Sequence, residues 1–233
     1  MNPDHPSMPN QQPAKTPKGR AKISQILEVA RSIFIQGGYA EMTMRQVAER
    51  SGITLSNLQH YFPTRENLLQ GLLEWVTNSY DPPFSEIEAS DAAPAARLEA
   101  ALRYFLQDAI RPETERLFVE IWSLATRDAM VRTIFDKMYT HQRQNLGRLL
   151  ASANPGLSHE EVQQRAALAS MQIEGLMLLI SENKPKHPEL AGIDETCVNA
   201  LMHLLLQAPG SIAVAKRNDA GWPTNSGEPT RHE

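Results

Sequence analysis

Apolar residues recur at helical spacing along most of the chain, and the first such stretch begins near Ile23. Gly37 and Gly38 end this stretch, because glycine readily adopts the left-handed backbone conformation of a helix C-cap. The pattern therefore predicts an amphipathic helix that stops at a glycine pair. Its apolar side chains follow intervals of three and four residues: Ile23, Ile26, Leu27, Ala30, Ile33 and Phe34.

A capping signal at Thr43 predicts a second, shorter helix over about residues 44–50. Thr43 and Gln46 have the spacing of a capping box, in which the threonine side chain accepts a hydrogen bond from the third helical residue. The apolar residues Val47 and Ala48 would be the buried side of this helix.

Two more helices are predicted after a sharp turn, which Gly52 permits. Thr54 can cap a third helix over about residues 55–61, and Pro63 stops it. Thr64 can cap a fourth helix, whose apolar stripe consists of Leu68, Leu69, Leu72, Leu73 and Val76.

Beyond Pro82-Pro83 the periodicity remains helical, and no stretch alternates with period two strongly enough to be a strand. Prolines fall in the expected gaps, at Pro112, Pro155, Pro185 and Pro188. Ser158 and Glu161 form another capping box. The chain is therefore predicted to be all-α. The further helices are expected over about 95–110, 113–126, 128–153, 159–182 and 194–207.

The composition is that of a soluble globular protein. The 233 residues are 41% hydrophobic and 21% charged, which is enough to build a sizeable core. The longest apolar run, Leu176 to Ile180, is too short to cross a bilayer, and the first twenty residues lack the apolar segment of a secretory signal. A single cysteine, Cys197, excludes an internal disulfide framework and fits a reducing cytoplasm, where we expect the protein to work.

The net charge of −4 hides an asymmetry along the chain. Residues 14–65 contain eight basic and three acidic side chains, whereas residues 66–233 contain 15 basic and 23 acidic ones. A basic N-terminal unit on an acidic body indicates that only the first part meets a polyanion.

The segment SGITLSNLQHYF, residues 51–62, has an unusual composition for a short helix. Ile53, Leu58 and Phe62 can anchor it, while most of the remaining side chains are uncharged hydrogen-bonding groups. A helix, a glycine-containing turn and a second helix form a helix-turn-helix, whose second helix enters the major groove of DNA. Short donors and acceptors suit base edges, so the uncharged polar face is explained if it reads DNA.

The stretch ILEVARSIFIQGGYAEMTMRQVAERSGITLSNLQHYFPTRENLL resembles the N-terminal domain of the TetR family of transcriptional repressors, over about residues 22–76. Its most specific parts are the glycine-pair helix end, the helix TMRQVAERSGI and the exit YFPTRENLL. The order and spacing of these parts carry the resemblance, because no single part would suffice.

The resemblance implies a homodimer whose two recognition helices contact the halves of a near-palindromic operator. By position, Thr43 and Arg45 would contact phosphates, and His60, Tyr61 and Arg65 would clamp the DNA backbone. The residues implied to face bases are Thr54, Leu55, Ser56 and Asn57. Taken singly, several of these have ordinary alternatives, such as a surface histidine, a helix cap or a core aromatic residue.

Gln59 departs from the family, which usually has an aromatic residue, most often tyrosine, at this position. Glutamine can bind a phosphate but cannot replace the packing of a tyrosine ring. It could instead recognise adenine with two hydrogen bonds.

Composition predicts a disordered arm and a loose tail, and with the resemblance it divides the chain into five parts. These are a disordered arm (1–20), a helix-turn-helix domain (21–65), a connecting helix (66–81), an effector-binding and dimerisation domain (82–208) and a flexible tail (209–233). The second half has no fingerprint for a particular ligand. Its candidate pocket residues are Phe105, Phe118, Trp122, Met138, Tyr139, Met171, Gln172, Glu174 and Met177, although such a set also fits an ordinary core.

Glu174 lies in the apolar stretch ASMQIEGLMLLI, where a lone carboxylate is costly. It could be the counter-ion or hydrogen-bond acceptor of a bound ligand. Alternatively, His141, Arg143, Arg165 or solvent could satisfy it.

The last two long helices are the most apolar, and two from each subunit could form a four-helix dimer interface. Burial within one subunit is the alternative. Cys197 and His203 are expected in the core or the interface.

An enzyme is not indicated, because the chain lacks metal-ligand spacing, a nucleophile elbow and a glycine-rich phosphate loop. No cofactor is predicted. The sequence favours a dimeric repressor released from its operator by a small molecule. The alternatives are an activator without ligand control and a helical protein-interaction module.

Overall fold

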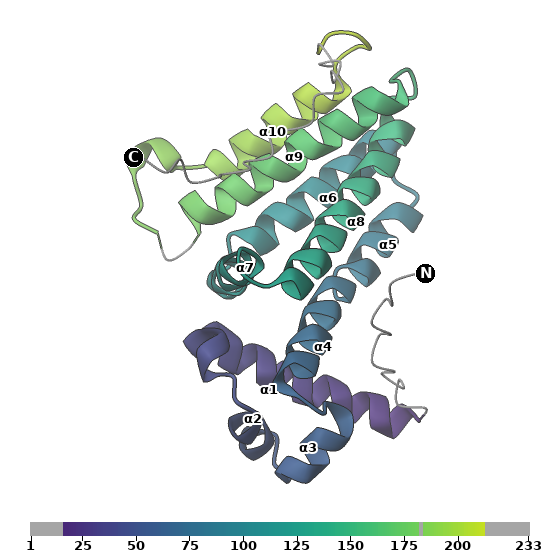
Figure 1. Ribbon diagram of the computed structural model, residues 1–233. Helices are drawn as coiled ribbons and strands as arrows, with labels where there is room; N and C mark the ends of the chain where they lie inside the picture. Colours follow the sequence, from purple (N-terminus) through teal and green to yellow (C-terminus); the bar gives the residue numbers. More distant parts are fainter. Residues whose placement is uncertain (1–15, 182–183, 213–233) are drawn as a thin grey trace, which may run out of the picture.

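The computed structural model describes residues 16–181 and 184–212, and within those ranges every regular element is helical (Figure 1). The predicted all-α class is therefore confirmed. The N-terminal elements are α1 (Pro17–Glu41), α2 (Met44–Arg50), α3 (Leu55–Tyr61) and α4 (Arg65–Asn78). The others are α5 (Asp81–Ala89), α6 (Pro94–Ala109), α7 (Pro112–Ala125), α8 (Ala129–Ala153), α9 (His159–Ile180), the short 3-10 helix η1 (Pro188–Leu190) and α10 (Ile193–Leu206).

Helices α1–α3 form a small head at one end of the molecule, and α4 leads from this head into a larger helical body (Figure 1). Phe34, Val47, Leu58 and Leu68 are almost completely buried, one from each of α1 to α4, so the four helices share one core. Removing these apolar side chains from water is the main favourable term that holds the short α2 and α3 in place.

The predicted threonine caps of the head are confirmed. The side chains of Thr43, Thr54 and Thr64 accept hydrogen bonds from the backbone N–H groups three residues further on, at 3.2, 3.2 and 3.1 Å. Each cap satisfies a donor that the first helical turn leaves unpaired. Gly38 and Gly52 have φ angles of 70° and 63°, as a glycine break and a tight turn require.

Helix α1 begins earlier than the periodicity predicted. Thr16 accepts a hydrogen bond from the backbone N–H of Gly19 at 3.1 Å, and Pro17 occupies the first turn, where no N–H is needed. The predicted arm over 1–20 is therefore too long, because residues 17–20 are helical. Its residues 1–15 lie outside the described part of the chain.

Helix α5 is not among the predicted helices, since the first one expected beyond Pro82-Pro83 covers about residues 95–110. Both prolines lie in the first turn of α5, where a missing N–H costs no helical hydrogen bond. Pro112 likewise begins α7 and does not lie in a gap.

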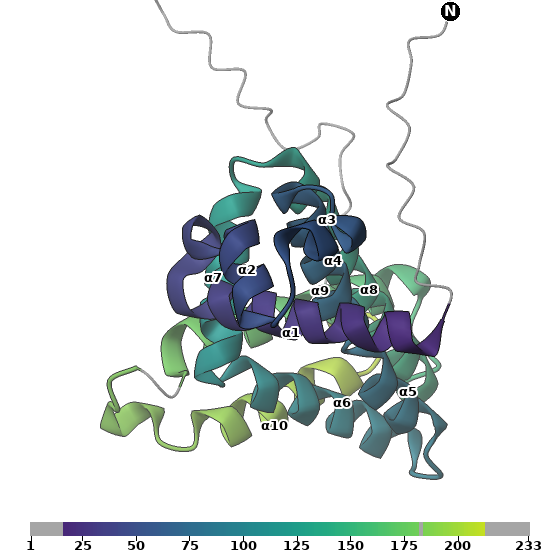
Figure 2. The same ribbon diagram turned by 90° about the horizontal axis from the view of Figure 1, so that it is seen from below.

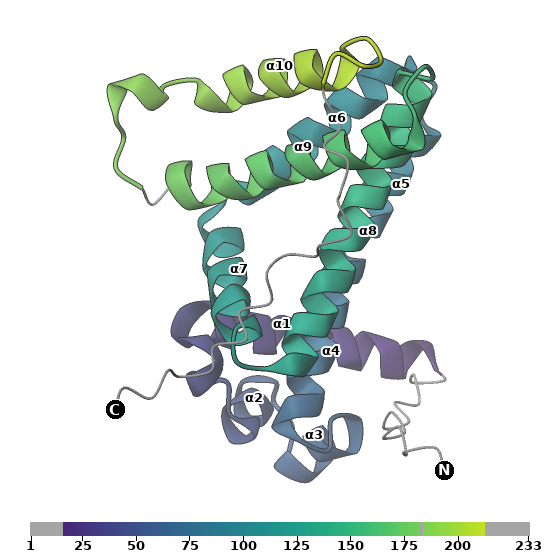
Figure 3. The same ribbon diagram turned by 45° about the horizontal axis from the view of Figure 1, so that its top comes forward.

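The body is built from long helices that pack against one another. Helix α8 packs against α6, α7 and α9, while α7 also touches α1 and α4 touches α8. Helices α9 and α10 run side by side along the face farthest from the head (Figure 3). Among the described residues, no helix is long and apolar enough to span a membrane.

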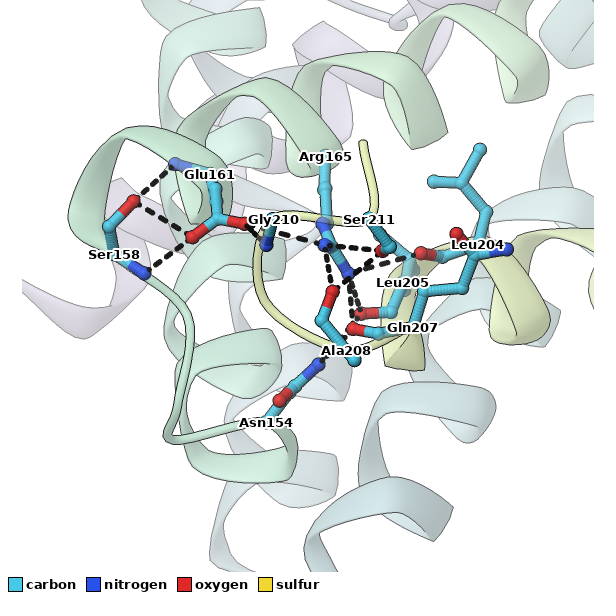
Figure 4. A network of polar contacts seen from close by, with 10 residues as sticks. All are labelled: Asn154, Ser158, Glu161, Arg165, Leu204, Leu205, Gln207, Ala208, Gly210 and Ser211. Atoms are coloured by element: carbon cyan, nitrogen blue, oxygen red, sulfur yellow. Dashed lines mark hydrogen bonds and ion pairs between the residues drawn. The ribbon is translucent and has the colours of Figure 1, made fainter. Parts of the chain in front are cut away.

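Arg165 closes the C-terminal end of α10 (Figure 4). Its side chain is 1% exposed, and its guanidinium donates to the carbonyls of Leu205, Gln207 and Ala208 at 3.1, 2.8 and 3.1 Å. A cation at this end also complements the helix dipole. The backbone N–H of Gly210 donates to Glu161 at 2.7 Å. Gly210 and Ser211, which were assigned to the flexible tail, are therefore held here. Residues 213–233 lie outside the described part.

Candidate DNA-binding face and ligand pocket

Burial divides the third helix into two faces, as the uncharged polar pattern predicted. Leu58 and Phe62 are buried, whereas the polar side chains Ser56, Asn57 and Gln59 are exposed. Of the remaining predicted contact residues here, Thr54 and His60 are exposed, and Leu55 and Tyr61 are partly buried. Apart from His60, the exposed face thus carries donors and acceptors with no formal charge.

Helix α2 packs against α3 at the same end of the molecule, and the two lie in front in the view from below (Figure 2). Thr43 and Arg45 are exposed at the N-terminal end of α2. Arg50 is also exposed, and its guanidinium donates to the side chain of Gln36 at 3.1 Å. Basic side chains therefore flank the uncharged face of α3.

Arg65 has a different set of partners from those predicted. Its guanidinium donates to the backbone carbonyls of Met42 at 3.0 Å, Ala40 at 3.3 Å and Tyr39, and it lies 3.9 Å from the centre of the Tyr39 ring. The side chain thus holds the connection between α1 and α2 and has few donors left for a phosphate. The prediction that it clamps DNA is revised accordingly.

The same connection is held from the other side by α7. The carboxylate of Glu120 accepts the backbone N–H of Tyr39 at 2.8 Å. A Cβ atom at Gly38 would lie 2.8 Å from this carboxylate, so a side chain there would displace it. Segment 39–42 is therefore bound both by α4, through Arg65, and by α7, through Glu120.

A cavity lies in the body, between α4, α6, α7, α8 and α9. Its volume of about 50 Å³ is room for a few water molecules. Six of the nine predicted pocket residues line it: Phe105, Phe118, Met138, Tyr139, Glu174 and Met177. A drug-sized ligand would require these helices to move apart.

The other three predicted pocket residues lie elsewhere. Met171 is 67% exposed and Gln172 is also exposed, because Ile173 and Met177 turn the opposite face of α9 toward the core. Neither side chain lines this cavity. Trp122 does not line the cavity, but its indole N–H donates to the hydroxyl of Tyr139, a lining residue, at 3.1 Å.

Nine lining residues were missed: Thr77, Tyr80, Asp108, Ala109, Thr114, His141, Gln142, Asn145 and Ile173. Part of this set had a sequence signal. His141, Gln142 and Asn145 follow Met138 at intervals of three, four and seven residues, which is a polar stripe along one side of a helix.

Glu174 is satisfied by a partner that was not predicted. The hydroxyl of Tyr139 donates to its carboxylate at 2.7 Å. Of the predicted partners, His141 pairs with Asp81 at 2.8 Å and Arg165 binds the end of α10. Burial raises the pKa of Glu174 to about 7, against the lowering effect of the Tyr139 hydrogen bond.

A stability prediction follows from this partly buried carboxyl. Because its folded-state pKa lies above the ordinary 4.5, Glu174 stabilises the fold while protonated, and this contribution is lost as the pH rises through about 7. The free energy of unfolding of Glu174→Gln, relative to that of the wild type, should therefore rise by about 1–3 kcal/mol from pH 5 to pH 8. Urea unfolding at both pH values measures this difference.

Glu160→Gln is the matched control, because Glu160 is an exposed carboxylate on the same helix. Its difference from the wild type should stay nearly constant over this range. If the Glu174→Gln difference also stays constant, the carboxyl is not held in a desolvated site.

Apolar side chains are exposed together on the face formed by α9 and α10. Leu168, Met171, Leu178 and Leu179 follow one another on α9 at intervals that form one stripe, and Leu206 of α10 is exposed as well. An exposed apolar stripe of this kind is typical of a protein interface.

The comparisons with known proteins agree across both halves of the chain. Residues 26–72 match the model of bacterial regulatory proteins of the tetR family, and residues 94–206 match the C-terminal model of BetI-type transcriptional repressors. An uncharacterized HTH-type transcriptional regulator from the dhlA 5' region of Xanthobacter autotrophicus is 31% identical over 147 residues, or 60% of this chain and 71% of that protein.

Two further relatives match over a shorter part, less than half of their own length. The regulator RutR of Escherichia coli is 31% identical over 99 residues (42% of this chain, 46% of RutR). The repressor KstR2 of Rhodococcus jostii is 28% identical over 89 residues (38% and 44%).

Solved structures share the fold. A transcriptional regulator from Rhodococcus sp. Rha1 superimposes with a TM-score of 0.60 at 21% identity, covering 78% of this chain and 93% of that one. A TetR transcription regulator from Haloarcula marismortui gives 0.62 at 16% identity, covering 79% and 96%. The chain belongs to the TetR family of DNA-binding transcriptional regulators, as the helix-turn-helix motif predicted.

Proposed function

We propose that this regulator is a homodimeric repressor, that residues 21–65 bind its operator, and that a small molecule in the cavity of residues 82–208 releases it. Residues 66–81 would form the connecting element. The observation that carries the proposal is the exposed, uncharged polar face of α3 beside the basic side chains of α2. Basic side chains supply attraction to phosphates for any sequence, whereas uncharged donors and acceptors can discriminate between bases.

In this proposal the head residues have separate tasks. Thr43 and Arg45 bind phosphates at the start of α2, and His60 and Tyr61 bind the DNA backbone at the end of α3. The base-reading residues are Thr54, Leu55, Ser56, Asn57 and Gln59. The exposed position of Gln59 is compatible with a bidentate contact to adenine.

Dimerisation through α9 and α10 would place two heads on one operator. Half-sites one helical turn apart require recognition helices about 34–36 Å apart. A change in the separation of the heads would therefore weaken both half-site contacts at once.

The two attachments of segment 39–42 give a route from the cavity to the head. Phe118 of α7 lines the cavity two residues before Glu120, and Thr77 of α4 lines it on the helix that starts at Arg65. A ligand larger than the present cavity must displace these helices. The ligand shifts the equilibrium between the two conformations only if it binds more tightly to the one whose heads do not fit the operator.

Selection of bound sequences from a random double-stranded DNA pool, at two salt concentrations, tests the proposed DNA reading. A near-palindromic consensus with steep salt dependence is expected from a dimeric reader that displaces counterions. No enrichment at either salt would contradict it and favour the protein-interaction module. The position of the operator relative to the promoter then separates repression from activation.

Substitutions in the head should separate base reading from phosphate binding. Asn57→Ala and Gln59→Ala are expected to change the preferred base at one position of each half-site, with discrimination falling by about 1–3 kcal/mol. Arg45→Ala should weaken binding to all sequences and lower the salt slope by about 1 per head.

Competition binding with the selected operator and its single-base variants measures both effects. All three side chains are exposed, so thermal unfolding should be nearly unchanged and serves as the control. If the variants only lose stability, the assignment of α3 as the reading face is wrong.

A further inference from the structure

The polar lining of the cavity includes two carboxyl side chains and no strongly basic one. Asp108 and Glu174 both line it, and its lining contains no lysine or arginine. His141 is the one lining side chain that can become positive, and its imidazole already pairs with Asp81 at 2.8 Å. The charged groups of the lining are therefore mainly acidic.

Each lining carboxylate receives a tyrosine hydroxyl but no close, buried cation. Tyr80 donates to Asp108 and Tyr139 donates to Glu174, both at 2.7 Å. Arg111 lies 3.7 Å from Asp108, but its side chain is largely exposed, so this pair is weak. Glu174 has no ion pair among the described residues, and it is the better candidate for a ligand's counter-ion.

Asn145 provides an independent indication of a ligand. The residue is 4% exposed and lines the cavity from α8. Its side-chain Oδ1 is buried without a hydrogen-bond partner within the described ranges. A buried acceptor without a partner costs free energy, which a donor on a bound molecule would recover.

Aromatic rings form much of the remaining wall. Tyr80 and Phe105 face each other with ring centres 6.2 Å apart, and Phe118 and Tyr139 line the cavity from α7 and α8. Aromatic faces attract cations, most strongly where water is excluded. The aromatic wall and the hydrogen-bond acceptors thus favour the same kind of ligand, a cation with hydrogen-bond donors.

We propose that the effector is an organic cation that carries N–H donors, such as a protonated amine or an amidinium on a compact aromatic or aliphatic body. The charge would be balanced by Glu174, an N–H group would bind Oδ1 of Asn145, and the apolar body would lie against the rings. A quaternary ammonium group would supply the charge but no donor for Asn145. This inference rests on the proposed role of the cavity as the effector site.

Matched probes can test this class of ligand. Benzylamine and benzamidine provide cationic N–H donors, benzyltrimethylammonium provides a cation without donors, and benzyl alcohol provides a neutral body of similar shape. Isothermal titration of the full-length protein at pH 8 should show that the two donor cations bind about tenfold more tightly or better than the other two probes. Equal or stronger binding of the neutral or quaternary probe, or no preference among the four, would overturn the proposal.

Variants connect the preference to particular side chains. Glu174→Gln and Asn145→Leu should each remove most of the preference for benzylamine, whereas Glu160→Gln should leave it intact. Binding of benzylamine to the wild type should tighten from pH 6 to pH 8, because burial keeps Glu174 partly protonated at the lower pH. His141→Gln should keep this trend, since the imidazole of His141 pairs with Asp81 and the trend is assigned to Glu174.

The outcomes for ligand class and for regulation are separable. Operator binding without any probe is measured on the same preparation and tests the DNA-binding role alone. If a neutral probe binds the cavity and releases DNA, the proposed function stands and the cation class is wrong. If the cations bind the cavity but no occupancy alters operator binding, the ligand class stands and the effector role is wrong.

Discussion

Replacing Arg165 by methionine is expected to lower the free energy of unfolding by about 3–5 kcal/mol, the usual cost of removing one partner from a buried ionic network. The guanidinium is the donor for the carbonyls that end α10, and it lies 3.6 Å from Glu161 (Figure 4). Methionine fills a similar volume but leaves those carbonyls without donors. Urea unfolding monitored by circular dichroism would measure the loss.

Arg148→Met is the matched control for this substitution. Arg148 pairs with Glu88 at 3.1 Å, but both side chains are about half exposed, so its loss should cost about 1 kcal/mol or less. Arg165→Lys should fall between the two, because an ammonium cannot reach as many carbonyls as the planar guanidinium. If Arg165→Met and Arg148→Met have equal effects, the network does not hold the end of α10.

Arg165 also shows why part of this structure could not be predicted. From the sequence it was one of three possible partners for Glu174. Its real partners are backbone carbonyls about 40 residues further along the chain. No side-chain pattern encodes such a set, because any residue contributes a carbonyl. Only the packing of α9 against α10 brings them together.

The head was more predictable because its signals are local. Each threonine cap depends on a donor three residues away, and each glycine break depends on its own backbone conformation. Local chemistry of this kind fixes where helices start and stop. It also fixes which face of α3 is polar, since Leu58 and Phe62 must be buried together.

The cavity was predicted only in part because the rotation of a helix is a tertiary property. The sequence placed Met171, Gln172 and Glu174 on one helix, but it could not say which of them faces inward. The partner of Glu174 lies 35 residues away on α8, and the partner of Arg65 at Met42 lies 23 residues back. The resemblance assigned Arg65 by position, and the structure assigns its donors to the α1–α2 connection.

A charge on the exposed apolar stripe should have the second large effect, because it would separate the subunits. Leu179 is 69% exposed in a single chain and lies on the stripe of α9 with Leu168 and Leu178. If two copies pair through this face, Leu179→Glu would bury one carboxylate from each subunit in the interface without a partner. We expect mainly monomer at micromolar concentration, measured by sedimentation velocity.

Operator affinity should fall when dimerisation is lost. A dimer binds its second half-site at a high effective concentration, and a monomer loses this advantage, which is typically worth a factor of about 10²–10⁴. Val119→Glu is the control, since Val119 is an exposed apolar residue on α7, away from the stripe. It should leave the dimer and the operator affinity unchanged.

The two readouts together decide between the alternatives for this face. A monomeric Leu179→Glu protein that retains its thermal stability and loses operator affinity would mean that α9 and α10 join two complete subunits. A dimeric variant with wild-type affinity would place the interface elsewhere and leave the stripe without a partner. A monomer with undiminished affinity would contradict paired half-site binding itself, because a single head would then suffice for the operator.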